Sequence, residues 1–207
     1  RFALILGAMD TGSSFEGMGA SREALYGALV EPALMLTAGT LALLAGHTSF
    51  ARIFAEAATG DLQLTVLLVL TAYVLVKIVF TESGRVPVDD PRTHLELTMI
   101  HEAMILEYSG RHLALIEWAA SLKLFAYSCL GIALFLPMGI AASAEPLALG
   151  VAGLYMVLKL AVGGFILALI ETLSAKMRIF RAPEFLGTAF LLGVLAMLVH
   201  LLLETGT

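Results

Sequence analysis

The sequence has 207 residues and a net charge of −5; 59% of the residues are hydrophobic and 14% are charged. About a quarter of the residues in soluble domains are charged, so this composition indicates a protein embedded in a membrane. The acidic balance argues against a nucleic-acid partner, which would favour basic patches. The single cysteine, Cys129, cannot supply the ligands of an iron–sulfur cluster or a structural zinc, so any redox metal is expected in another chain.

Apolar runs of about 20 residues, the length that crosses a bilayer, predict an all-α, multi-pass bundle. Five complete spans are expected, at residues 24–46, 62–81, 113–137, 147–173 and 185–203. A shorter apolar run at residues 2–9 is expected to be the tail of a truncated span. Residues 10–23 are expected to be a glycine-rich loop, with or without a short surface helix. Residues 50–58 have the apolar spacing of a short interfacial helix. With no linker or clear repeat, residues 1–207 are predicted to form one membrane domain that lacks its N-terminal spans.

The basic residues predict an orientation, because they favour the cytoplasmic ends of membrane spans. One set of alternate loops carries seven of them: Arg22, Arg85, Arg92, Arg111, Lys176, Arg178 and Arg181. The opposite loops carry only Arg52. This distribution places the polar segment 82–112 in the cytoplasm and the C-terminus outside, in the inner or plasma membrane of the cell.

Segment 82–112 is the main polar stretch between apolar runs. Two prolines exclude a continuous helix through its first part, and irregular backbone cannot lie in hydrocarbon. Thr93 and Glu96 form a capping-box pattern, and Gly110 is typical of a helix end. The sequence therefore predicts a helix over residues 94–109 at a membrane face or a wet cavity.

Four interpretations of this segment remain open. It is a solvated cytoplasmic helix, a proton entry site whose carboxylates are perturbed by burial and by Arg85 or Arg92, a docking surface for a partner protein, or a metal site. The metal site is the weakest, because the sequence has Ile105 where an HExxH motif needs its second histidine. The docking interpretation would use Arg92, Glu102, Arg111, Arg178 and Arg181.

Six ionisable residues lie inside predicted spans, where a charge costs about 2.5–3.5 kcal/mol on insertion scales. They are Glu31, Lys77, Glu117, Lys123, Lys159 and Glu171. Pro32 removes a helical hydrogen bond beside Glu31, which favours ordered water there. Lys77 has a simpler explanation, in which its ammonium reaches the headgroups. Lys123 and Lys159 are expected near mid-membrane, where each must face protein, a carboxylate or a hydrated path. The pattern predicts a polar funnel from the loop to the bilayer centre.

The sequences ESGRVPVD at residues 82–89 and EYSG at residues 107–110 resemble the cytoplasmic loop of the membrane protein that forms the quinone cavity of respiratory complex I. The resemblance extends to Glu31 and to residues 175–187, so it covers nearly the whole chain. Complex I forms usually follow the loop's aspartate with Leu-Pro and an acidic run, whereas residues 90–92 are Asp-Pro-Arg. This continuation is similar to the counterpart in energy-converting membrane-bound NiFe hydrogenases and formate hydrogenlyase.

The resemblance implies a non-catalytic coupling subunit without a metal or cofactor of its own. It would anchor peripheral hydrogenase-like or complex I-like subunits, which hold a NiFe centre and iron–sulfur clusters, and join them to antiporter-like membrane subunits that pump protons or sodium. The loop-side entrance of a proton path would then be Glu82, Arg85, Asp89, Glu96 and Glu107, and the buried path Glu31, Glu117 and Glu171. The cost of burial adds Lys123 and Lys159 to this path. The alternatives are a quinone-cavity subunit of an NADH dehydrogenase, which would bring a quinone, a stand-alone ion transporter and a pure scaffold.

Overall fold

A computed structural model describes the chain except for residues 60–65, 90–98, 142, 176, 178–180 and 206–207. All regular structure in the described residues is helical, which confirms the predicted fold class. The elements are α1 (Phe2–Asp10), α2 (Ser14–Ala45), α3 (Phe50–Thr59), α4 (Val66–Glu82), the 3-10 helix η1 (Glu102–Ile105), α5 (Gly110–Phe135), α6 (Pro146–Leu173) and α7 (Ala182–Thr205).

Four of these helices, α2, α5, α6 and α7, are long and apolar enough to cross a membrane. Helix α4 has 17 residues, and the predicted start of its span at residue 62 lies outside the described residues. The count of five complete spans therefore stays a prediction. The predicted short helix at residues 50–58 is present as α3.

Helix α2 begins ten residues before the predicted start of its span at residue 24. Residues 14–23 are therefore the first part of this long helix, and the prediction of a loop or a separate short surface helix there is wrong. Ser13 is its N-cap and Glu16 lies in the first turn, which is a capping-box spacing that the glycine-rich composition concealed. Gly19 is a packing site, because a Cβ there would lie 2.9 Å from the Cβ of Ala103. The helix then continues through Pro32 to Ala45.

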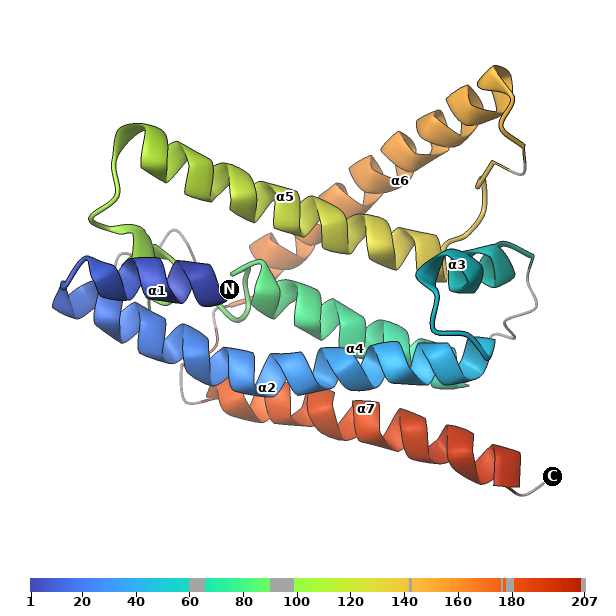
Figure 1. Ribbon diagram of the computed structural model, residues 1–207, viewed down its shortest axis with the longest axis horizontal. Coiled ribbons are helices and arrows are strands. Elements are labelled where there is room, and N and C mark those ends of the chain that lie inside the picture. Colours follow the sequence, from blue (N-terminus) through green and yellow to red (C-terminus); the bar gives the residue numbers. More distant parts are fainter. Residues whose placement is uncertain (60–65, 90–98, 142, 176, 178–180, 206–207) are drawn as a thin grey trace.

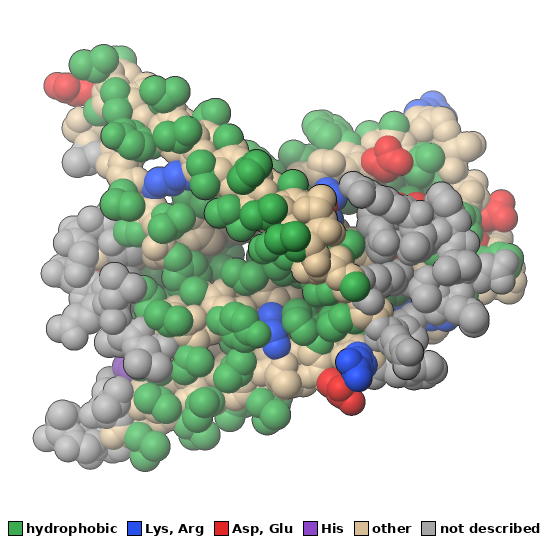
Figure 2. All heavy atoms as spheres, turned by 180° about the vertical axis from the view of Figure 1, so that it is seen from behind, with side chains coloured by type: hydrophobic (Ala, Val, Ile, Leu, Met, Phe, Trp, Pro, Cys, Tyr) green, Lys and Arg blue, Asp and Glu red, His purple; other side chains and the backbone are tan. Residues whose placement is uncertain are grey.

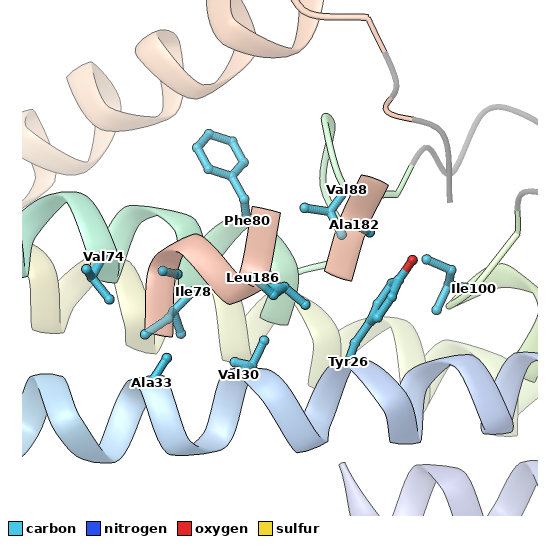
Figure 3. Close-up of a cluster of buried hydrophobic side chains, with 11 residues drawn as sticks. Tyr26, Val30, Ala33, Val74, Ile78, Phe80, Val88, Ile100, Ala182 and Leu186 are labelled. Carbon is cyan, nitrogen blue, oxygen red and sulfur yellow. The ribbon is translucent and has the colours of Figure 1, made fainter. Parts of the chain in front are cut away.

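The bundle is organised around α2, α4 and α7, which pack against one another (Figure 1). Helix α1 lies along the first half of α2, and α5 packs on α4. An apolar cluster between α2, α4 and α7 forms the core (Figure 3). It contains Tyr26, Val30 and Ala33 of α2, Val74, Ile78 and Phe80 of α4, Val88 and Ile100 of the central segment, and Ala182, Leu186 and Ala189 of α7.

Helix α6 leaves this bundle at an angle, and none of its residues is buried (Figure 1). The described part of the surface in Figure 2 is mostly apolar, with isolated charged side chains. Large apolar side chains exposed over several helices are typical of surfaces that face lipid or other membrane subunits.

The helix predicted over residues 94–109 is wrong across its described second half. Only residues 102–105 are helical there, as η1, and Ser109 is extended. The amide N–H of Glu107 donates to Oε1 of Glu16 at 2.8 Å, whereas in an α-helix it would donate to a carbonyl within the same segment. Gly110, with φ +55°, begins α5 instead of ending a helix.

Candidate functional site

Four charged side chains from separate parts of the chain meet where α4 ends. Nε of Arg1 lies 2.9 Å from Oε1 of Glu23 in α2, and Nη2 of Arg1 lies 2.6 Å from Oε1 of Glu82 in α4. The second carboxylate oxygen of Glu82 lies 3.4 Å from Nζ of Lys123 in α5. We call these four residues the ion-pair cluster. With two carboxylates and two cations, its formal charges cancel.

The backbone holds this cluster in place through two glycines. Gly84, with φ +59°, lets the chain turn directly after Glu82, and the amide N–H of Arg85 donates to the carbonyl of Phe80 at 3.0 Å. On α2, a Cβ at Gly27 would lie 2.9 Å from Nη1 of Arg1. The missing side chain at Gly27 therefore makes room for the buried guanidinium.

A small cavity of about 10 Å³ adjoins the cluster, and its polar lining comes from Glu23, Tyr26, Glu82, Asp89 and His101, among others. This volume is close to what a single water molecule needs. The buried hydroxyl of Tyr26 makes no hydrogen bond within the described residues. Its side chain extends from α2 toward Val88 and Ile100 (Figure 3). The cavity thus has enough polar groups around it to bind one water.

Asp89 and His101 connect the two described parts of the central segment. Oδ2 of the buried Asp89 accepts the backbone N–H of His101 at 3.0 Å. Burial lowers the pKa of His101, and Lys123 acts in the same direction, while the carboxylates of Glu23, Asp89 and Glu102 oppose the shift. His101 is therefore held neutral near pH 7, beside carboxylates.

A second ion pair joins the central segment to α6. Nη1 of Arg85 lies 3.4 Å from Oε1 of Glu171, near the end of α6. The amide N–H of Met177 also donates to the carbonyl of Pro87 at 2.9 Å. These contacts fix the turn after α4 against the segment that leads into α7.

Residues 1–202 match the family described as NADH dehydrogenase. The chain belongs to this family. Two Escherichia coli (strain K12) proteins are similar to it. Hydrogenase-4 component C is 43% identical over 140 residues, which are 67% of this chain and 43% of that protein. Formate hydrogenlyase subunit 4 is 32% identical over 190 residues, which are 92% of this chain and 61% of that protein. The chain thus spans about half the length of these curated relatives.

The family match confirms the resemblance to complex I and hydrogenase membrane subunits. In this NADH dehydrogenase-family chain, four of the predicted path residues form ion pairs. Glu82 pairs with Lys123, and Arg85 pairs with Glu171.

The structure of this chain alone does not enclose Glu31 and Glu117, so their place on a buried path stays a prediction. Both side chains are exposed on the outer surface of this chain. On α2, Glu31 is exposed, whereas its neighbours Val30 and Ala33 belong to the core. Glu107 is exposed as well.

Among the described residues, Lys159 forms no ion pair with a carboxylate, and it does not line the cavity beside the ion-pair cluster. Its Nζ donates to the carbonyl of Leu136 at 2.5 Å and to that of Met138. These carbonyls follow the last turn of α5, where the helix has no further backbone N–H groups to donate to them. Lys159 therefore caps the end of α5. It faces protein, which is one of the three surroundings expected for it, and its place on a proton path stays a prediction.

Three predicted residues, Arg92, Glu96 and Arg178, lie outside the described residues. Of the other candidates for partner docking, Arg111 and Arg181 are exposed and Glu102 is half-buried. Within the part of the chain that the structure describes, no group of three histidine, cysteine or acidic side chains could hold a metal ion.

Sequence reasoning missed Arg1, Glu23, Glu16 and Tyr26. The signal was present in the spacing of Glu16 and Glu23, since residues seven apart lie on one face of a helix. Tyr26 continues the same face. Treating residues 10–23 as a loop hid this pattern.

Proposed function

We propose that this chain is the membrane coupling subunit of an energy-converting, hydrogenase-type complex related to complex I. The ion-pair cluster and its adjoining cavity are the observation that carries the proposal, because they place three carboxylates, a tyrosine and a histidine around one potential water site. The similarity to hydrogenase-4 component C and to formate hydrogenlyase subunit 4 favours the hydrogenase branch.

In this function, segment 82–112 faces the cytoplasm and a peripheral arm docks on it. The arm carries the NiFe centre and the iron–sulfur clusters, and Arg92, Glu102, Arg111, Arg178 and Arg181 are its proposed contacts. Antiporter-like subunits join the chain within the inner membrane. This chain performs no redox chemistry itself.

Coupling begins when electron transfer in the arm changes the charge or hydration at the loop. Glu82 balances Arg1 and Lys123, so a charge that attracts or repels either cation changes the ion pairs that hold this carboxylate. A water in the cavity then connects Glu82 with Glu23 and Asp89. Glu96 and Glu107 supply protons from the loop.

From the cluster, the path continues toward the outer surface of the bundle. Glu31 on α2 and Glu117 on α5 are exposed there, and partner membrane helices cover them in the complex. Glu171 links the loop to α6 through Arg85.

The test compares hydrogen evolution with ion pumping in inverted membrane vesicles that contain the whole complex. Glu82→Gln changes the cluster, whereas Glu31→Gln changes an exposed side chain and leaves the fold intact. Both variants are expected to evolve hydrogen with strongly reduced pumping. Glu145→Gln, an exposed position before α6, is the control and should pump normally. Normal pumping in both test variants would refute the proposal.

The family description favours one alternative, the quinone-cavity subunit of an NADH dehydrogenase. A pull-down in mild detergent separates the two functions. A NiFe large subunit and hydrogen evolution support the hydrogenase branch, whereas NADH-module subunits and reduction of a quinone analogue support the alternative.

A further inference from the structure

Lys77 of α4 has a buried ammonium group whose partners are all neutral. The residue is 7% exposed, and its Nζ donates to Oγ1 of Thr188 at 2.6 Å and to the carbonyl of Phe185 at 3.4 Å. The ammonium also lies 4.3 Å from the ring centroid of Phe185 and 5.1 Å from that of Tyr73. Within the described residues, no carboxylate forms an ion pair with it.

The position of this ammonium does not fit an interaction with lipid headgroups. Helix α7 begins at Ala182, so Phe185 and Thr188 lie roughly 5–9 Å along its axis. Helix α4 continues for five residues beyond Lys77, roughly 7.5 Å. A lysine that reached for the headgroups would extend toward these helix ends. The Nζ of Lys77 is instead held by Phe185 and Thr188, in the first two turns of α7.

The surface beside Lys77 is apolar and has helical spacing. Val69, Tyr73 and Val76 are exposed on one side of α4. Thr188, Leu191 and Leu195 are exposed on the adjacent side of α7. We call these six residues the α4–α7 face. Lys77 lies at the seam between the two helices, since it contacts Tyr73 on one and Thr188 on the other.

We propose that the α4–α7 face binds a membrane helix of a partner subunit, and that an aspartate or glutamate on this helix forms an ion pair with Lys77. This inference rests on the proposed function as a subunit of a membrane complex. Among the described residues, this ammonium donates two hydrogen bonds to neutral oxygens, has one hydrogen left over and has no carboxylate to balance its charge. A carboxylate on the partner helix accepts the remaining ammonium hydrogen and balances the charge of Lys77. The apolar side chains of the α4–α7 face pack against the rest of that helix.

Photo-crosslinking in native membranes tests which molecule covers this face. A benzophenone amino acid replaces the exposed Tyr73 in the complete complex, and mass spectrometry identifies the crosslinked peptide. The expected product is a membrane-helix peptide with an aspartate or glutamate within one turn of the crosslink. Crosslinks to lipid alone, or to a peptide without an acidic residue, would overturn the inference.

A charge-exchange experiment then tests the ion pair itself. Lys77→Glu is expected to reduce co-purification of the crosslinked subunit by about tenfold, and exchange of its carboxylate for lysine should restore it. Arg52→Glu, a reversal at an exposed site on α3, is the matched control and should change neither result. Failure of the exchange to restore binding would overturn the ion pair. An active hydrogenase-type complex with only lipid at Tyr73 refutes this inference alone, whereas a chain that purifies without any partner subunit refutes the proposed function as well.

Discussion

Replacing Glu82 with glutamine tests the ion-pair cluster most directly. Glu82 is the central member, because its two carboxylate oxygens face Arg1 and Lys123 at 2.6 Å and 3.4 Å. Glutamine keeps the size of the side chain and removes its charge. The variant leaves Lys123 without its carboxylate, while Arg1 keeps Glu23.

The distances and exposures set the expected magnitude. With an effective dielectric constant of about 20, unit charges at these two separations attract by about 6 and about 5 kcal/mol. Desolvation offsets much of this attraction, and removal of one partner from a buried pair costs about 3–5 kcal/mol. The Lys123 side chain is 31% exposed, so water replaces part of its lost interaction. We therefore expect a loss near the lower end of that range, about 3 kcal/mol.

Thermal unfolding measures this loss through Cys129, the only cysteine in the chain, which is half-buried on α5. The complex is heated in mild detergent, labelled with a maleimide, and digested, and mass spectrometry quantifies labelling of the Cys129 peptide. A loss of about 3 kcal/mol corresponds to a midpoint lower by about 6–12 °C for a chain of this size.

Glu117→Gln is the matched control, because Glu117 is exposed and forms no ion pair among the described residues. Its midpoint should stay at the wild-type value. If the Glu82 and Glu117 variants unfold at the same temperature, the cluster does not contribute as its distances indicate, and the reasoning is wrong.

Three further changes have defined outcomes. Gly27→Ala should lower the Cys129 labelling midpoint by displacing the guanidinium of Arg1, a cost of about 1–3 kcal/mol, whereas Gly39→Ala, with open space around the new Cβ, should not lower it. Lys159→Met removes two charged hydrogen bonds of about 1.5–3 kcal/mol each, so limited proteolysis should cut residues 137–145 faster. Burial lowers the pKa of His101 from 6.5, so the folded state binds fewer protons than the unfolded state, and stability is full above about pH 6.5 and falls as the pH drops below it. His101→Gln should flatten this dependence when midpoints are compared between about pH 5 and about pH 8.

The long apolar helices could be predicted from the sequence because a bilayer fixes their length and polarity. Helix α6 begins one residue before the prediction and ends where predicted, at Leu173. Its boundaries are simple, since Pro146 marks the start and a polar segment follows the end.

The ion-pair cluster could not be predicted in full because its members come from distant parts of the chain. Arg1 and Lys123 reach Glu82 only through the packing of α1, α4 and α5. Glycines on α2 also misled the prediction, since the sequence does not distinguish a glycine in a loop from Gly19, which lies inside the helix and makes room for Ala103. The helix predicted over residues 94–109 was wrong for a related reason. The amide of Glu107 bonds to Glu16, a contact between residues 91 positions apart that the local sequence does not reveal.

The exposed position of Glu31 changes how a proton path through this chain has to be built. A carboxylate that faces lipid near the middle of a helix costs about 2.5–3.5 kcal/mol on insertion scales. Glu82 avoids this cost through its two cations, whereas Glu31 forms no ion pair among the described residues. A wet interface with another membrane subunit removes the cost for Glu31 without burying it in this bundle. Under the proposed function, the path therefore begins inside the chain at the cluster and is completed by a partner at the surface of α2.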